Sequence, residues 1–351
     1  ANWDDPLNWT ADSGFPVSGD RVSFQGTVNT AVSLQGDQAA RKIAFSDQNA
    51  FTINGHTLTL DAGGSLARVD VGSSTGQVIV NSAVTLAGSA IFRNDRGWSH
   101  ETSQLSLRGA LTGSVTLTIE GAGSGGVELR ADNASTFTGP IVVNGGWFLV
   151  GHSQALGDVG HGTTLNSGAT LVFRGGVNTP EHFTVAGNAN QSSLSPSSAS
   201  GTFTVNDGAT FTINNGGGNT FNLTGTLAGP GGIVMTSGGS VLSGSSPNTL
   251  GGLIDHQSDR SSDGLNTLTL DKSGGAAAIA GPLKLSKKAI VKWAQNDQVA
   301  DISSIELAGG VLNPDGHSDA LGMLTVTGPG EIDLSGGPNT LRFADSRTET
   351  W

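Results

Sequence analysis

The sequence contains no cysteine and no tyrosine, and only 13% of its 351 residues are Asp, Glu, Lys or Arg. Without cysteine there is no disulfide framework from which a redox compartment could be inferred. No apolar run reaches the ~18 residues that a transmembrane helix needs, so we expect no membrane insertion. The net charge of −12 disfavours nucleic acid as a partner, because nucleic-acid-binding surfaces carry a basic stripe.

Glycine, by contrast, is abundant, with 54 residues. This is about 15% of the chain, roughly twice the average share. No glycine recurs at every third residue, which excludes a collagen-like triple helix. Glycine and proline together make up about 19%, which is below the share typical of disordered low-complexity chains. The glycines are therefore expected to serve an ordered structure.

The dominant local pattern is apolar–Thr–apolar, which is typical of half-buried β-strands. It occurs at Leu58–Leu60, Phe203–Val205, Phe211–Ile213, Leu268–Leu270 and Leu324–Val326. Asn-Gly, Asp-Gly, Gly-Gly and Ser-Gly pairs between these segments supply turns with positive φ. Such segments recur about every 8–12 residues, so the sequence predicts an all-β fold. Residues 283–308 form the longest stretch without Gly or Pro, and they are compatible with either a helix or two strands.

Internal repeats favour stacked coils. The segment VNSAVTL at 80–86 recurs as LNSGATL at 165–171 and as VNDGATF at 205–211. The last two copies start 40 residues apart, which equals two turns of a β-solenoid with ~20 residues per coil. Residues 106–123 and 222–239 also match each other. At ~20–25 residues per coil the chain would form roughly 14–17 coils, a rod of about 70–80 Å. Tandem antiparallel β-sandwiches are the alternative fold.

Residues 129–173 contain a strand, a turn from Asn133 to Gly139 with Phe137 as its aromatic residue, and the sequences VVNGG and QALG. This stretch resembles a known family, the autotransporter-associated β-strand repeat. Residues 293–346 are similar to the C-terminal region of large secreted bacterial proteins built from this repeat. The tryptophan-rich start NWDDPLNW at 2–9 is similar to their N-terminal segment.

The resemblance implies a right-handed parallel β-helix in a bacterial protein that is secreted or displayed on the cell surface. We therefore expect one continuous β-helix over residues 1–351. It would comprise N-terminal coils (1–100), a repeat-bearing middle (101–260) and C-terminal coils (261–351). The family is functionally diffuse, so the resemblance implies architecture and an extracellular location more directly than an activity.

Short motifs for catalysis or cofactors are present but lack their structural context. The glycines of a GxGxxG pattern, Gly121 to Gly126, precede an expected strand, whereas a dinucleotide site needs a helix there. A GxSxG pattern centred on Ser74 is likewise followed by an expected strand, not the helix of a nucleophile elbow. The seven histidines have no metal-binding spacing. We predict no cofactor and no metal; the turn Asn313–Gly316 offers oxygen ligands, but calcium is not predicted.

The favoured function is that of an extracellular structural protein, not an enzyme. A solenoid end exposes an unpaired rung, and natural solenoids need caps. The sequence shows no amphipathic capping helix, and its tips carry Trp3, Trp9 and Trp351. These tryptophans are the candidate residues for head-to-tail self-association into a fibre or surface matrix. An adhesin that contacts glycans or host proteins through flat faces is the alternative, and a polysaccharide-active enzyme is a lesser one.

Overall fold

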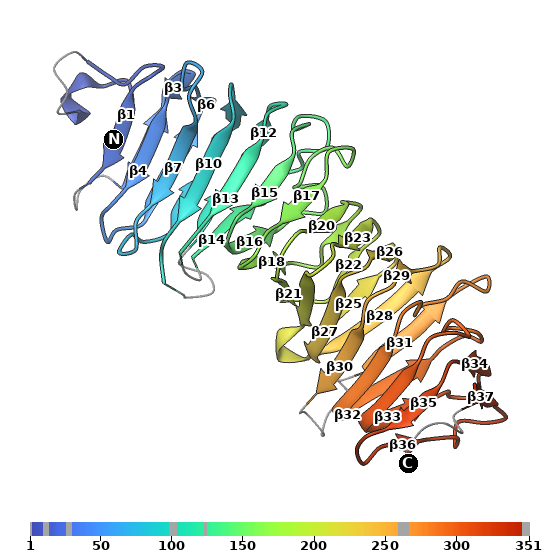
Figure 1. Cartoon of the computed structure of the whole chain (residues 1–351). Helices are drawn as coiled ribbons and strands as arrows, with labels where there is room; N and C mark the ends of the chain where they lie inside the picture. Colours follow the sequence, from blue (N-terminus) through green and yellow to red (C-terminus); the bar gives the residue numbers. More distant parts are fainter. Residues whose placement is uncertain are drawn as a thin grey trace. The chain divides into compact units, whose positions relative to one another are not determined.

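The computed structural model describes residues 2–9, 14–25, 30–97, 104–122, 125–258 and 267–345. It is an all-β structure with 50% strand and 2% helix, and its parallel sheets stack into a β-solenoid of about 14 turns (Figure 1). The predicted fold is confirmed, with a number of turns at the lower end of the expected range. The alternative of tandem antiparallel sandwiches is wrong, because neighbouring strands run parallel.

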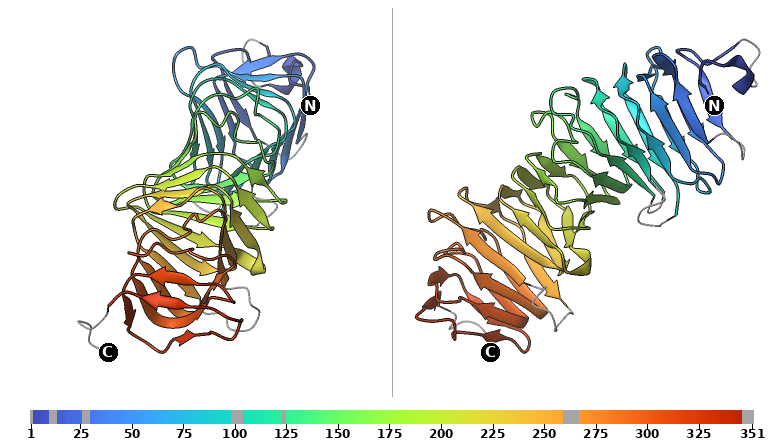
Figure 2. Two further views of the ribbon diagram at one scale, coloured as in Figure 1. Left: turned by 90° about the vertical axis from the view of Figure 1, so that its right-hand side faces the viewer. Right: turned by 180° about the vertical axis from the view of Figure 1, so that it is seen from behind.

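The chain divides into two compact units, residues 1–172 and 173–351. Within each unit, successive turns of the backbone place their strands side by side (Figure 2). The expectation of one continuous β-helix, with coils 1–100, 101–260 and 261–351, is not tested by this division and stays a prediction. The two units are described separately below.

In the first unit, a turn contributes strands to three parallel ladders. The first ladder consists of β1 (Arg21–Phe24), β4 (Lys42–Phe45), β7 (Ala67–Val71), β10 (Ala90–Asn94), β13 (Leu117–Glu120), β15 (Ile141–Val143) and β17 (Thr163–Leu165). The second consists of β2 (Ala31–Leu34), β5 (Phe51–Gly55), β8 (Val78–Val80), β11 (Leu105–Leu107), β14 (Gly126–Leu129) and β16 (Gly146–Val150). The third consists of β3 (Gln38–Ala40), β6 (Leu58–Leu60), β9 (Val84–Leu86) and β12 (Leu111–Thr112). A 3₁₀ helix, η1 (Pro6–Asn8), precedes them, and β18 (Ala169–Phe173) runs across the boundary at residue 172.

The second unit follows the same three-ladder plan. Its first ladder consists of β20 (Phe183–Val185), β23 (Thr202–Val205), β26 (Thr226–Gly229) and β29 (Thr249–Leu250). Its second consists of β21 (Ala189–Ser193), β24 (Thr210–Asn214), β27 (Gly232–Ser237), β30 (Ile254–Ser258), the first parts of β32 (Leu283–Trp293) and β33 (Ile305–Asn313), and β35 (Leu324–Val326). Its third consists of β19 (Asn178–Thr179), β22 (Ser197–Ala199), β25 (Thr220–Leu223), β28 (Gly239–Gly244), β31 (Thr267–Lys272), the last parts of β32 and β33, and β36 (Glu331–Ile332). The strands β34 (Asp319–Leu321) and β37 (Leu341–Phe343) pair separately, and η2 (Gly216–Gly218) is a second 3₁₀ helix.

Alternation of side chains along each strand builds the core. In β4, Ile43 and Phe45 are each 1% exposed, whereas the residues between and before them point outward. This is the period of two that a half-buried strand requires. In the second unit, the buried rings of Phe183 and Phe203 are paired in register on β20 and β23, and their centroids lie 4.6 Å apart. Equivalent side chains of successive turns thus form ladders along the interior.

Turn length varies around the predicted value. Among the described strand pairs, the register steps range from 19 residues, as from Ile305 to Leu324, to 29 residues, from Ile254 to Leu283. The sequence of residues 283–308 is compatible with either a helix or two strands. In the structure, these residues contain β32 and the start of β33. A bulge after Lys287, at φ 62°, lets the 11-residue β32 pass from the second ladder to the third.

The sequence repeats mark a type of corner. In the copies at 165–171 and 205–211, the chain leaves a first-ladder strand through a turn closed by Asn166 and Asn206, whose carbonyls accept the N–H three residues later. Gly168 and Gly208 then adopt φ of 83° and 71°. The copy at 80–86 connects the second ladder to the third and has Ala83 at this position. The turn is therefore shared by the two copies that have glycine at this position, and both of these connect the first ladder to the second.

Candidate functional site

An aromatic plug, formed by Trp3, Trp9 and Phe24, closes the first turn of the first unit. Trp3 is fully buried, at 0% exposure, and its ring centroid lies 5.2 Å from that of Trp9 and 6.1 Å from that of Phe24. Trp3 Nε1 donates a hydrogen bond to the Pro16 carbonyl at 3.3 Å, and Trp9 Nε1 donates to the Trp3 carbonyl at 2.6 Å. Both indoles are thus packed with their polar groups satisfied, as buried tryptophan requires.

The backbone holds this plug against the first turn. The Trp3 N–H donates to the Ser33 carbonyl of β2 at 2.9 Å, which continues the parallel pairing by one residue. Gln38 Nε2, at the start of β3, donates to Asp4 Oδ1 at 2.9 Å. The chain then turns through η1, where proline at the first position is favoured because its missing N–H needs no partner. The plug therefore acts as a cap without an amphipathic helix.

Large apolar side chains are also exposed in this N-terminal segment. Leu7, in η1, is 92% exposed, Phe15 is 42% exposed and Val17 is 54% exposed. They flank the plug along the chain, and Pro16 between them is buried. Exposed apolar side chains in one short segment are candidates for contact with a partner. These three residues are referred to below as the N-terminal apolar residues.

The last turn of the second unit presents the opposite situation. Strands β35 and β36 pair with β33 on one side, and the described residues provide no strand on the other side. One turn earlier, the inward side chains of Ile305, Leu307 and Leu312 are 0–3% exposed. In the last turn Val326 is 39% exposed and Leu334 54% exposed. The described C-terminal end thus exposes apolar side chains beside free strand edges.

The structure places the predicted assembly tryptophans unequally. Trp3 is buried inside its own chain, so its ring contributes to the plug and not to the outer surface. Trp9 is partly exposed at the rim of the plug. Trp351 lies outside the described residues. The assembly role of these three residues stays a prediction. The N-terminal apolar residues and Leu334 were missed, although Pro16 beside Phe15 and Val17 was a signal of an irregular, outward segment.

Charged side chains form outward ladders across neighbouring turns. In the first unit, Asp70 on β7 lies 2.7 Å from Lys42 Nζ on β4 and 3.0 Å from an Arg68 guanidinium nitrogen. Burial opposes ionisation of Asp70, but hydrogen bonds from Arg68 and Lys42 outweigh it and lower its pKa. In the second unit, Lys284 Nζ lies 2.8 Å from Glu306 Oε1.

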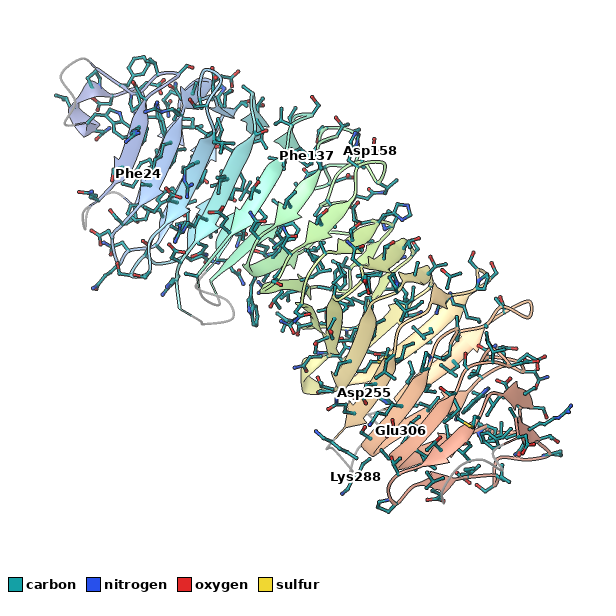
Figure 3. The ribbon with its side chains drawn as sticks, viewed as in Figure 1. Phe24, Phe137, Asp158, Asp255, Lys288 and Glu306 are labelled. Carbon is teal, nitrogen blue, oxygen red and sulfur yellow. The ribbon has the colours of Figure 1, made fainter. Side chains whose placement is uncertain are left out.

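The second-unit ladder follows the strand register. Asp255, Lys284 and Glu306 occupy successive strands at one position, and Figure 3 labels the two carboxylates on β30 and β33. The hydrogen bond from Lys284 is the main cause that lowers the pKa of Glu306. These alternating charges satisfy one another, so they stabilise the register of adjacent turns.

Lys272 and Asp319 are two of the ionisable side chains that are buried in the second unit. Lys272 is 0% exposed, and its Nζ donates to the Gly225 carbonyl at 2.6 Å. Burial lowers the pKa of Lys272 to about 8, because desolvation disfavours the ammonium form. Asp319 is 4% exposed and accepts three hydrogen bonds through Oδ2. Both groups sit inside the coil, out of reach of a macromolecular substrate.

The motifs considered for catalysis fall in turns and strands. Ser74 lies in the turn between β7 and β8, and Gly126 begins β14, so a strand follows each motif. Gly123 and His100 lie outside the described residues. His182 Nδ1 accepts the Thr202 N–H at 3.0 Å, and Lys292 engages the Asp315 carboxylate at 2.8 Å in the oxygen-rich turn.

Among the described residues, no group of three or more His, Asp or Glu side chains is placed to hold a metal ion. None of the helices in the described part of the chain is long and apolar enough to cross a membrane.

Enclosed spaces within each unit are small and apolar. One of about 10 Å³ in the first unit is lined by side chains that include Ile43, Phe45 and Phe92. One of about 10 Å³ in the second unit is lined by side chains that include Phe211 and Met235. A space of this size holds at most one water molecule, and only when polar groups surround it. These interior spaces are packing voids.

Comparison with known proteins does not identify a relative. No family model, no curated protein and no solved structure matches the chain.

Proposed function

We propose that this chain is a non-enzymatic structural module of a secreted or cell-surface protein, and that it assembles end to end. The C-terminal end of one copy would receive the N-terminal end of the next. The observation that carries the proposal is that, among the described residues, Val326 and Leu334 of the last turn are exposed beside strands that pair on one side only.

The physical reason is that such an edge favours association. Its unpaired N–H and C=O groups are a template for another strand, and its apolar side chains gain free energy when a partner removes them from water. The exposed Leu7, Phe15 and Val17 supply apolar side chains at the other end. A contact between two different surfaces is heterologous, and it does not close unless the rotation forms a ring. The expected product is therefore a fibre or an extended matrix.

The sequence resemblance supports the location. Residues 129–173 and 293–346 resemble the autotransporter-associated β-strand repeat, and the β-solenoid agrees with the fold that this resemblance implies. Proteins with that repeat are secreted or displayed on bacterial surfaces. We therefore propose an extracellular setting, with other copies of the chain as the principal partner and with no nucleic acid or cofactor.

Complementation between two end-blocked variants tests the proposal. One variant carries Leu7→Asp and Phe15→Asp, and the other carries Val326→Asp and Leu334→Asp; all four side chains are more than a third exposed. Analytical ultracentrifugation would follow each protein over a wide concentration range. We expect the wild-type mass to grow with concentration, each variant alone to stay monomeric, and an equimolar mixture to form dimers and nothing larger.

The other outcomes have distinct meanings. A wild-type protein that is monomeric at every concentration contradicts end-to-end assembly. If the variant blocked at its N-terminal end forms dimers alone, the C-terminal ends associate with each other and the head-to-tail arrangement is wrong. Circular dichroism of both variants checks that the substitutions leave the fold intact.

A second candidate function is adhesion through an outer face. On the first ladder of the second unit, Thr202 and Thr226 are register partners whose hydroxyl oxygens lie 2.9 Å apart, and Thr184 and Thr204 form the neighbouring pair. Regular hydroxyl rows suit contact with a glycan. A glycan array would compare wild type with Thr202→Val/Thr204→Val, and Thr59→Val on the third ladder of the first unit serves as control. Loss of signal confined to the double variant supports adhesion, and absence of wild-type signal excludes the glycans tested.

A further inference from the structure

Corner asparagines connect three successive turns of the coil. Asn133, 1% exposed, accepts the Leu111 N–H through Oδ1 at 2.8 Å, from the preceding turn. Its own N–H donates to the Gln154 carbonyl at 3.0 Å, and its Nδ2 donates to the next carbonyl, of Ala155, at 2.7 Å. The side chain uses its acceptor toward the turn before and its donor toward the turn after.

Asn248 in the second unit repeats this arrangement. It is 3% exposed, and its Oδ1 accepts the Leu227 N–H of the preceding turn at 2.9 Å. Its N–H donates to the Ala277 carbonyl at 3.0 Å, and Nδ2 donates to that of Ala278 at 2.8 Å. Two corners in different units therefore share one hydrogen-bonding pattern, with a buried amide as its centre.

Asp319 occupies a third corner of this kind, with a carboxylate in place of the amide. Its Oδ2 accepts the N–H groups of Gln298 and Val299 in the preceding turn, each at 2.9 Å, and the Trp293 indole at 2.7 Å. Its own N–H donates to the Thr340 carbonyl at 2.9 Å. The other oxygen, Oδ1, is buried and has no hydrogen-bond partner. By correspondence, the carbonyl that an amide would reach is that of Leu341, the first residue of β37.

We infer that Asp319 is a proton-dependent latch for the last turn. When the carboxyl is protonated, its O–H takes the place of the amide donor and binds the Leu341 carbonyl, which tightens β37 against β34. When the carboxyl is ionised, Oδ1 has no proton to donate to the Leu341 carbonyl oxygen, and this hydrogen bond is lost. The last turn, which also carries the proposed association edge, is then held less firmly. The inference does not depend on the assembly proposal.

The surroundings of Asp319 favour the protonated form. Burial is the main cause that raises the pKa of Asp319, and the hydrogen bonds from Trp293, Val299 and Gln298 oppose it. Among the described residues, the charged group that acts on Asp319 is Asp297, whose negative charge raises the pKa further. Because the folded-state pKa lies above the unfolded one, this stabilisation is complete below the unfolded pKa and is lost as pH rises through the folded pKa.

Hydrogen–deuterium exchange of the full chain tests the latch, with rates corrected for the intrinsic pH dependence of amide exchange. In wild type, protection of residues 340–345 is expected to rise as pH falls from neutral into the range of carboxyl titration. In Asp319→Asn, protection of these residues is expected to be about two- to tenfold higher than in wild type at neutral pH, because one hydrogen bond contributes a factor of this size. It is also expected to be independent of pH. The reciprocal variant Asn248→Asp serves as the matched test, and it should acquire the same pH dependence around Ala278.

Two results would overturn the inference. One is an Asp319→Asn variant whose exchange in residues 340–345 keeps the pH dependence of wild type. The other is an Asn248→Asp variant whose exchange around Ala278 is unchanged at neutral pH. Since asparagine and aspartate have the same shape, both proteins should fold, and thermal unfolding of each at neutral pH checks this point.

Discussion

The two described ends of the chain differ in how they treat the edge of a parallel ladder. At the N-terminal end, a short irregular segment places Trp3 over the first turn, satisfies its indole N–H and leaves its ring 0% exposed. In the last turn, Val326 and Leu334 remain 39% and 54% exposed. Both ends terminate the same kind of ladder, so the difference lies in the side chains that follow or precede it.

The N-terminal end shows what a cap of a β-solenoid requires. The plug needs large rings to cover the cross-section, and a few hydrogen bonds to position them; Gln38 to Asp4 is one example. An amphipathic α-helix is not part of this cap. In the described part of the last turn, apolar side chains are exposed that earlier turns bury, and this exposure carries a free-energy cost of about 25 cal/mol per Å² of apolar surface. A partner that covers the surface removes the cost.

The largest predicted effect breaks the N-terminal cap. Trp3→Ala removes a fully buried ring together with its indole hydrogen bond to the Pro16 carbonyl. We expect the free energy of unfolding to fall by about 3–5 kcal/mol, the range for truncation of a buried aromatic residue. Urea denaturation followed by tryptophan fluorescence and circular dichroism would measure it.

Leu7→Ala is the matched control in the same segment. Leu7 is 92% exposed, so its truncation should change the free energy of unfolding by less than about 0.5 kcal/mol. Equal losses for Trp3→Ala and Leu7→Ala would show that the segment is held by something other than the burial of Trp3.

The next prediction compares two turns at the C-terminal end. Leu312 and Ile332 are register partners on β33 and β36, yet Leu312 is 0% exposed and Ile332 only half-buried. Leu312→Ala should cost about 2–5 kcal/mol, whereas Ile332→Ala should cost less than about 1 kcal/mol, because a partly exposed side chain leaves a smaller cavity. Thermal unfolding of both proteins at low concentration, where association is weak, gives the two values. A large loss for Ile332→Ala would mean that the last turn is covered.

Much of the fold could be predicted from the sequence because it depends on local patterns. Alternation in segments such as Phe203–Val205 gave the strands, and Gly168 and Gly208 at positive φ marked the corners. The number of turns followed from the repeat spacing.

The sites at the ends were harder to predict. The tryptophan-rich start drew attention to the correct segment, but whether Trp3 points inward depends on Ser33 and Gln38, 30 or more residues away. The equivalence of Asn133, Asn248 and Asp319 likewise becomes visible only when distant turns are stacked. Asn248 and Asp319 are each followed by Leu-Gly two residues later, but Asn133 is not.

The smallest predicted effect concerns the outward charges, which occur in both units. Asp70 is held by Lys42 and Arg68 and its side chain is 22% exposed, whereas Glu306 is held by Lys284 and its side chain is 36% exposed. Exposed ion pairs contribute little to stability. Asp70→Asn should therefore lower the free energy of unfolding by about 1 kcal/mol at neutral pH, and Glu306→Gln should lower it by a few tenths of a kcal/mol. Thermal unfolding at low and high salt would measure both, and salt should reduce each difference.

The sign of the pH dependence separates these carboxylates from Asp319. The pKa of Asp70 and that of Glu306 are lowered in the folded chain, so their stabilisation is present above the unfolded pKa and is lost as pH falls through the folded pKa. Asp319 has a raised pKa and acts in the opposite direction. On acidification, the ion pairs of the outer ladders should weaken, whereas the hydrogen bond from Asp319 to β37 should form. The stability of Asp70→Asn should therefore approach that of wild type in acid. Asp319→Asn should be more stable than wild type at neutral pH and should lose this difference in acid. If both variants follow the same pH profile, the contrast between an outward ion pair and a buried corner carboxyl does not hold.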